Sequence, residues 1–157
     1  MSSPDHRQGG GGWAQNLDVG PLRRGPAQGA GPGIHRGLVD LDLAPLAVAL
    51  EDTNPFSVVD LSYNKISVGG AESLKKLLEK DATIAALDLS QNDLDATAAL
   101  AIADGCKANK AVKVLSLSGN AIGGAGGMAM AELLQSTATL EQLHLANCGL
   151  DTASLVA

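Results

Sequence analysis

The sequence predicts an α/β repeat protein in which each repeat contributes a short strand, a turn and a helix. The first observation is an eleven-residue phrase, VKVLSLSGNAI at Val112–Ile122, that recurs at a regular interval along the chain. The second is alternation inside the phrase, because Leu115 and Leu117 put two side chains on one face of an extended segment. The third is the helical spacing of apolar residues between copies. The other copies are Phe56–Ile66 (FSVVDLSYNKI), Ile84–Leu94 (IAALDLSQNDL) and Leu140–Leu150 (LEQLHLANCGL).

The phrase has the pattern L-x-x-L-x-L-x-x-N-x-L, which with a period of about 28 residues is the signature of leucine-rich repeats. Over Phe56–Leu150, and more faintly from Leu38, the chain resembles the ribonuclease-inhibitor-like subfamily, in which Asn and Cys interchange at the turn. The resemblance implies a right-handed horseshoe with a parallel sheet on its concave side and helices on its convex side. It also implies that the concave side binds other proteins.

One polar column marks the turn of every copy, and it consists of Asn64, Asn92, Asn120 and Cys148. Backbone groups turn inward where the chain leaves the strand, so they need buried partners. An Asn amide both donates and accepts, so stacked copies can bridge neighbouring turns as the ladder of the resembled family does. The alternative is that each Asn is simply a favoured turn residue, which the regular spacing disfavours. A Cys is only a weak donor, which suits a terminal repeat.

Residues 1–36 differ in composition from the remainder, since they hold nine of the 19 Gly and four of the six Pro. Such a segment buries too little apolar area to offset the entropy of ordering it. We therefore expect a disordered Gly/Pro-rich tail at 1–36, either a linker or a segment joined artificially, in which Trp13 is exposed or forms a short docking motif. A leucine-rich repeat domain is expected at 37–157, with a partial first repeat, three full repeats and a truncated last repeat.

The domain is expected to begin with a helix over Leu43–Asp52, ended by Thr53-Asn54-Pro55, whose own strand is missing. The three full repeats place further helices over Ala71–Lys80, Ala96–Lys107 and Gly126–Gln135. Their inward residues are expected to be Leu74, Leu77 and Leu78, then Ile102, Gly105 and Cys106, then Met130, Leu133 and Leu134.

The fourth copy is expected to end the sheet, with Gln142–Leu145 as an edge strand and no helix after it. Its leucines then lack a following repeat, although solenoids usually cover such an end with a polar cap. We expect self-association or binding of a partner strand at this uncapped end. The chain could also be a fragment or an isoform of a longer repeat protein.

The formal net charge of −6 is unevenly distributed, because residues 1–36 carry +2 and the remainder −8 without a single Arg. An acidic repeat body does not favour nucleic acid, and no apolar run approaches the roughly 18 residues that a membrane helix needs. Cys106 and Cys148 are expected to be free buried thiols with no metal cluster around them. Together with a polar start of the chain, this favours a cytoplasmic location, with nuclear or cytoskeletal association left open.

Two patterns could carry chemistry. The stretch GAGGMA at Gly124–Ala129 fits the G-x-G-x-x-A of dinucleotide-binding turns, but it occupies the variable turn of a repeat, which explains it without a ligand. Asp60, Asp88, Ser116 and His144 share one register position and include the residue types of a Ser-His-Asp relay. An open sheet face supplies neither an oxyanion hole nor exclusion of water. We expect no catalytic residue, no cofactor and no metal.

The outward strand positions form the candidate partner-binding surface. This surface is acidic at one end and nearly neutral at the other, and it offers few of the aromatic and Arg side chains that dominate interfaces. We expect a non-catalytic scaffold that binds a protein partner, and the alternative is a regulator of an enzyme, like ribonuclease inhibitor or the leucine-rich GTPase-activating proteins. The candidate residues are Asp60, Ser62, Tyr63, Asp88, Ser90, Ser116, Ser118, Gln142 and His144.

Overall fold

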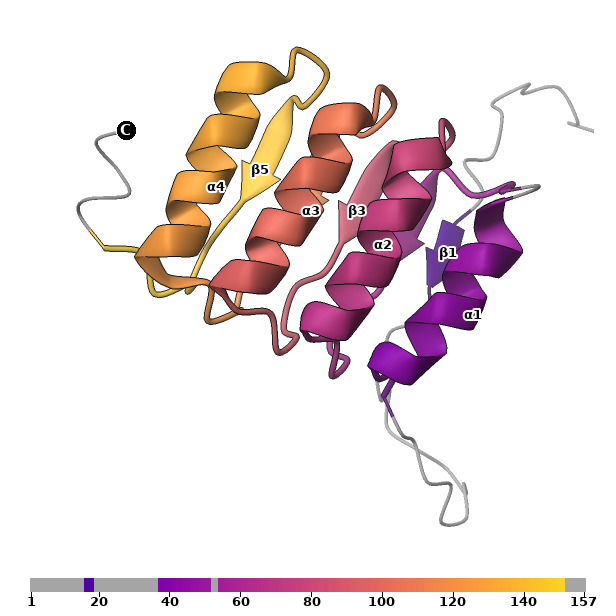
Figure 1. Cartoon of the computed structure of the whole chain (residues 1–157), viewed down its shortest axis with the longest axis horizontal. Coiled ribbons are helices and arrows are strands. Elements are labelled where there is room, and N and C mark those ends of the chain that lie inside the picture. Colours follow the sequence, from indigo (N-terminus) through magenta and orange to yellow (C-terminus); the bar gives the residue numbers. More distant parts are fainter. Residues whose placement is uncertain (1–15, 19–36, 52–53, 152–157) are drawn as a thin grey trace, which may run out of the picture.

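The computed structural model describes residues 16–18, 37–51 and 54–151 as one parallel sheet with helices on one side (Figure 1). The strand order β1-β2-β3-β4-β5 follows the chain, so every repeat lies beside the next one. The predicted α/β solenoid is confirmed. Its elements are β1 Asn16–Asp18, α1 Asp40–Glu51, β2 Val58–Asp60, α2 Val68–Lys80, β3 Ala86–Asp88, α3 Ala96–Ala108, β4 Val114–Ser116, α4 Gly123–Ser136 and β5 Gln142–His144.

Strand β1 contradicts the expectation that the first repeat has no strand and that residues 1–36 are disordered throughout. Leu17 pairs in register with Val59 and packs, partly buried, against the core. A single inward leucine suffices because the edge of β2 offers unpaired backbone groups to any extended segment beside it. The pattern missed this strand because the regular spacing points to Gly31 as the counterpart of Val59, and Leu17 lies well before that position. The other residues of 1–36 lie outside the described residues.

The strands β2 to β5 keep the predicted register. Val59, Leu87, Leu115 and Leu143 are aligned across the sheet, and their side chains point toward the helices. The three leucines two residues further on in the complete repeats are fully buried. The alternation that defines the phrase therefore divides the sheet into a face against the helices and an open face.

Three helices begin three residues earlier than predicted, at Asp40, Val68 and Gly123. The glycines that precede the predicted helix starts therefore lie inside the first helical turn. At α2 the reason is that Asp40, from the preceding repeat, accepts a hydrogen bond from the Ser67 backbone N–H at 2.7 Å. A Cβ at Gly70 would collide with Ile66 and Asp40. Because glycine has no Cβ, the N-terminal turn of α2 can pack against α1.

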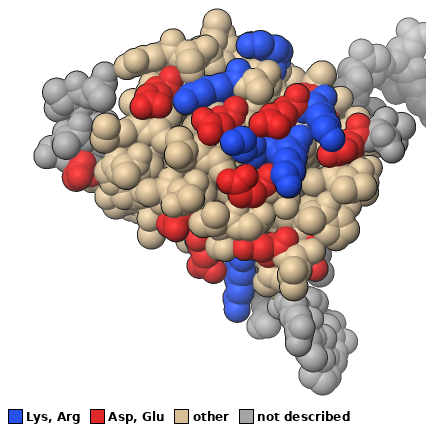
Figure 2. All heavy atoms as spheres, in the orientation of Figure 1, with Lys and Arg blue, Asp and Glu red and all other residues tan. Residues whose placement is uncertain are grey.

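The helix side carries interspersed positive and negative side chains, which gather over α2 and α3 (Figure 2). Ion pairs join successive helices, with Lys80 3.0 Å from Glu51 and Lys75 3.4 Å from Asp104. Exposed pairs of this kind stabilise by at most about 1 kcal/mol each. Among the described helices, none combines the length and apolar character needed to cross a membrane.

The inward helix positions are confirmed with one exception. Leu74, Leu77 and Leu78 are buried, as are Ile102, Gly105, Cys106, Met130 and Leu133. Leu134 was expected inside as well, but it is 51 % exposed. The residues at the equivalent position on the preceding helices face the next helix. No helix follows α4 among the described residues.

Candidate functional site

The turns are tied together by the side chains of the polar column. The amide nitrogen of Asn92 donates to the Leu61 carbonyl of the preceding repeat at 3.0 Å and to the Leu89 carbonyl of its own repeat, also at 3.0 Å. Each amide thus satisfies buried backbone groups of two repeats at once. In the return direction, the Oδ1 atoms of Asn64, Asn92 and Asn120 accept from the backbone N–H groups of Leu38, Ile66 and Leu94 at 2.7, 3.0 and 3.2 Å.

At the last turn the same position is held by a thiol. Cys148 donates from Sγ to the Leu117 carbonyl at 3.3 Å, so it replaces one of the bonds that an Asn makes. Burial raises the pKa of Cys148, and backbone hydrogen bonds from Asn120 and Gly119 act in the opposite direction without outweighing it. Cys106, buried in α3, has its pKa raised to about 12 by burial. Both cysteines are free thiols.

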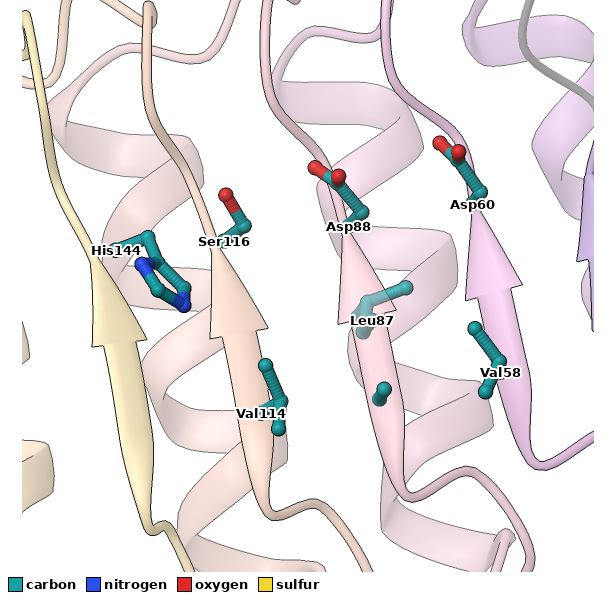
Figure 3. Close-up of a pocket in the computed structure, with 8 residues that line it drawn as sticks. Val58, Asp60, Leu87, Asp88, Val114, Ser116 and His144 are labelled. Carbon is teal, nitrogen blue, oxygen red and sulfur yellow. The ribbon is translucent and has the colours of Figure 1, made fainter.

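The open face of the sheet, defined as the face turned away from the helices, carries the candidate site in two rows (Figure 3). The upper row contains Asp60, Asp88, Ser116 and His144, which the strand register aligns. The lower row contains small or medium side chains at Val58, Ala86 and Val114. Both rows line a shallow hollow of about 300 Å³. In the strand register, Asp18 of β1 pairs with Asp60, which the sequence pattern had not predicted.

Short local hydrogen bonds hold the carboxylates of this row. Asp60 accepts from the Ser62 backbone N–H at 2.9 Å, and Asp88 accepts from the Ser90 backbone N–H at 2.8 Å. All these bonds use Oδ1, so the Oδ2 atom of each carboxylate has no hydrogen-bond partner among the residues that the structure describes. Two acceptor oxygens are therefore available to a ligand, beside the apolar lower row.

The upper row does not assemble a catalytic relay. The hydroxyl of Ser116 lies 2.6 Å from the hydroxyl of Ser90. His144 is exposed on β5, and its imidazole takes part in no hydrogen bond within the described part of the chain. Nucleophilic catalysis needs a base hydrogen-bonded to the nucleophile and a third group that orients the base, and this arrangement offers neither.

The remaining candidate residues lie around the edge of the open face, with one exception. Ser62 is 8 % exposed and is therefore a turn residue rather than a contact residue. Ser90 and Ser118 are half-buried, and Gln142 is exposed on β5. Tyr63 projects outward from a left-handed turn position with φ of 56° and is 57 % exposed.

A second polar column, which the sequence pattern did not reveal, lies at the ends of the helices. Asn109 is almost completely buried, and its amide donates to the carbonyls of Leu78 and Asp81 in the preceding repeat at 2.8 and 2.7 Å. Asp81 holds the same place one repeat earlier, where its Oδ1 accepts from the Ile84 backbone N–H at 2.7 Å. The spacing of these two residues, which is that of the repeat itself, was the signal that could have revealed the column.

The glycines of GAGGMA serve packing. A Cβ at Gly126 would lie 2.7 Å from the Ile122 Cβ and 3.2 Å from the Ala99 Cβ, so this glycine lets α4 approach α3. At Gly124 a Cβ would collide with the carboxylate of Asp151, a negative group at the helix N-terminus where a pyrophosphate would otherwise lie. No group of three or more His, Cys, Asp or Glu side chains in the described residues is placed to hold a metal ion.

Comparison with known proteins agrees with this geometry. A family model described as Leucine Rich repeat matches residues 56–75 and 108–131. The described residues therefore have the fold of a leucine-rich repeat solenoid. No curated protein matches the sequence. Its structure is similar to the solved structure of leiomodin-1 actin-binding site 2, with a TM-score of 0.69 and 21 % sequence identity over 83 % of this chain and 69 % of that chain. At this identity the similarity supports the fold.

Proposed function

We propose that the leucine-rich repeat array is a non-catalytic scaffold that binds a protein partner across the open face of its sheet. The observation that carries the proposal is the shallow hollow, which takes its lining from four successive strands, β2 to β5. A site spread over four strands and open to solvent suits an extended surface of another protein. The solved neighbour is named for an actin-binding site, which supports a protein as the class of partner.

The charge of the open face points to a basic partner segment. Asp60 and Asp88 each have an Oδ2 atom without a hydrogen-bond partner among the described residues, and the outward positions of β2 to β5 contain no Lys or Arg. Below them, Val58, Ala86 and Val114 form a floor on which the aliphatic stems of Lys or Arg can lie. A partner with Lys or Arg side chains spaced to reach successive strands, about 5 Å apart, fits both features.

Selection from a phage-displayed library of random peptides on the immobilised full chain tests this proposal. The enriched peptides should be rich in Lys and Arg, and a synthetic copy should bind roughly three- to tenfold more weakly to the Asp60→Asn/Asp88→Asn double variant. The matched control is Glu72→Gln/Glu79→Gln, which removes two exposed carboxylates from the helix side. Enrichment of acidic peptides, or an equal loss in both double variants, would contradict the proposal.

We further propose that the array belongs to the ribonuclease-inhibitor-like subfamily. The length of the repeat period, the full α-helix in each complete repeat and Cys148 in the Asn column support this assignment. If Asn and Cys are interchangeable there, Cys148→Asn should unfold at the same or a higher urea concentration than the natural chain. A destabilisation of more than about 1 kcal/mol would count against it.

A further inference from the structure

The turn that follows β2 exposes the single tyrosine of the chain. Tyr63 is 57 % exposed, whereas its chain neighbours Ser62 and Asn64 are buried. The Tyr63 backbone N–H donates to the Ser90 carbonyl of the next repeat at 2.9 Å. The Asn64 amide donates to the Leu61 carbonyl, also at 2.9 Å. The backbone that carries the ring is therefore held in place, while the ring itself is open to solvent.

The conformation of this turn does not favour a tyrosine. Tyr63 has φ of 56°, and the same turn position in the later repeats holds Gln91, Gly119 and Asn147, with φ of 56°, 74° and 56°. Positive φ suits Gly and Asn, and it is uncommon for a bulky side chain. Since the ring is exposed, it also contributes little to the core. A conformational cost without a gain inside the chain points to a contact with another molecule.

The tyrosine stands at the edge of the upper row of the open face. Tyr63 follows Asp60 by three residues, so their Cα atoms are at most about 11 Å apart. The Asp60 carboxylate is directed toward the same turn, because its Oδ1 atom accepts from the Ser62 backbone N–H. Lys65 lies two residues beyond the tyrosine, but Asp93 holds its register position in the next repeat, so these two turns add no net positive charge. A cation bound at the Oδ2 atom of Asp60 is therefore close to the ring as well.

We propose that Tyr63 and Asp60 form a subsite for an arginine side chain of the basic partner segment. This inference rests on the proposed function of the open face, and it specifies one side chain of the partner. A planar guanidinium can stack on an aromatic ring and donate to a carboxylate at the same time, whereas the lysine ammonium is a compact, strongly hydrated charge. An aromatic side chain on a rigid turn also loses little conformational freedom on binding. The bound segment then extends from the hollow over the turn that follows β2.

Two short synthetic peptides, one of alternating Arg and Ala and one of alternating Lys and Ala, test this subsite. Fluorescence anisotropy of the labelled peptides at low salt measures their affinity for the full chain. The Arg peptide should bind about two- to fivefold more tightly than the Lys peptide. Tyr63→Asn should remove this preference, and Tyr63→Phe, which keeps the ring, should retain it. The Asp60→Asn/Asp88→Asn variant should bind both peptides more weakly.

Two further measurements separate binding from a structural role of the ring. Because the chain has one tyrosine, selective isotope labelling gives a single set of tyrosine ring signals in NMR spectra, and these should shift on addition of the Arg peptide. Urea unfolding of Tyr63→Asn should have its midpoint at the same or a higher urea concentration than that of the natural chain, since Asn tolerates positive φ. A structural role would instead make Tyr63→Asn less stable.

Failure of the subsite and failure of the proposed function give different results. Equal affinity of the Arg peptide for the natural chain and for Tyr63→Asn, with both peptides still weakened by Asp60→Asn/Asp88→Asn, would overturn the subsite alone. Loss of the Arg preference in Tyr63→Phe would overturn it too, because the ring is still present. An affinity that does not change when both carboxylates are removed would contradict the proposed function. Absence of binding by either peptide would overturn both.

Discussion

The third copy of the repeat phrase, Val112–Ile122, and the fourth, Leu140–Leu150, have the same pattern but different surroundings. The third lies between two repeats, whereas the fourth has a neighbour on one side in the described structure (Figure 1). Leu117 is fully buried, but Leu145 at the same position is only partly buried. The comparison shows that a solenoid residue is buried by the repeat that follows it as much as by its own.

The polar column of the turns shows the same contrast between the third and the fourth copy. Asn120 exchanges hydrogen bonds with the preceding repeat in both directions, accepting from Leu94 and donating to the Leu89 carbonyl. Cys148 donates to the Leu117 carbonyl and accepts from the backbone N–H groups of Asn120 and Gly119, but its sulfur is both a weak donor and a weak acceptor. The terminal repeat therefore contributes less polar cross-linking as well as less apolar burial.

The largest effect on stability should come from the aligned leucines that face the core. Leu117→Ala should lower the free energy of unfolding by about 2–5 kcal/mol, because it leaves a cavity inside a fully packed region. Leu145→Ala should lower it by only about 1 kcal/mol, since water already reaches that side chain. Urea denaturation of both variants measures the difference. Equal losses would show that the end of the array is covered as well as its interior.

The second-largest loss of stability should come from the asparagines of the polar column. Asn120→Ala removes the side-chain acceptor of two backbone N–H groups and one of the donors to each of two buried carbonyls, and should cost about 2–4 kcal/mol. Cys148→Ala removes a thiol whose sulfur forms only weak hydrogen bonds, and should cost less than about 1 kcal/mol. Thermal and urea unfolding can rank the two. A larger loss at Cys148 would mean that the last turn depends on its thiol more than its geometry indicates.

A smaller effect is expected where one repeat caps the helix of the next. Burial acts to raise the pKa of Asp40, but hydrogen bonds from the Ser67 hydroxyl and from the backbone N–H groups of Ser67, Gly70 and Gly69 outweigh it and hold this pKa below 3.8. The carboxylate thus stabilises the fold above that pH, and the contribution is lost as the pH falls through the lowered pKa. Asp40→Asn should cost about 1 kcal/mol at neutral pH, as for other helix caps.

Urea unfolding of the natural chain and of Asp40→Asn, from neutral pH down to about pH 3, tests the sign of this effect. The difference between the two proteins should shrink on acidification. Growth of the difference at low pH would show that the carboxylate does not stabilise the start of α2 through its charge.

The smallest effect on stability should be on the open face, because this face is turned away from the helices. Ser116→Ala removes a half-buried hydroxyl and should change the free energy of unfolding by no more than about 0.5 kcal/mol. Compared with Leu117→Ala at the adjacent residue, it tests which side of β4 faces the core. Similar losses at the two positions would reverse the assignment of the faces.

Much of this fold follows from the periodicity alone. Leu115 and Leu117 point the same way in any extended chain, and translation by one repeat length then stacks every copy in the same order and register. The aligned row of Asp60, Asp88, Ser116 and His144 could be predicted for the same reason. Its chemistry could not, because only the observed hydrogen bonds show that Ser116 contacts Ser90 and that one oxygen of each carboxylate is free.

Contacts between repeats decided the rest, because they depend on neighbours that no local pattern encodes. Strand β1 has one inward leucine in a Gly-rich segment, and it is a strand because the edge of β2 can pair with it. Helix α2 starts at Val68 because Asp40 of the previous repeat reaches its first turn. Leu134 matches the inward pattern as well as Leu78 does, yet it is exposed, since burial requires a second surface and that surface belongs to the next repeat.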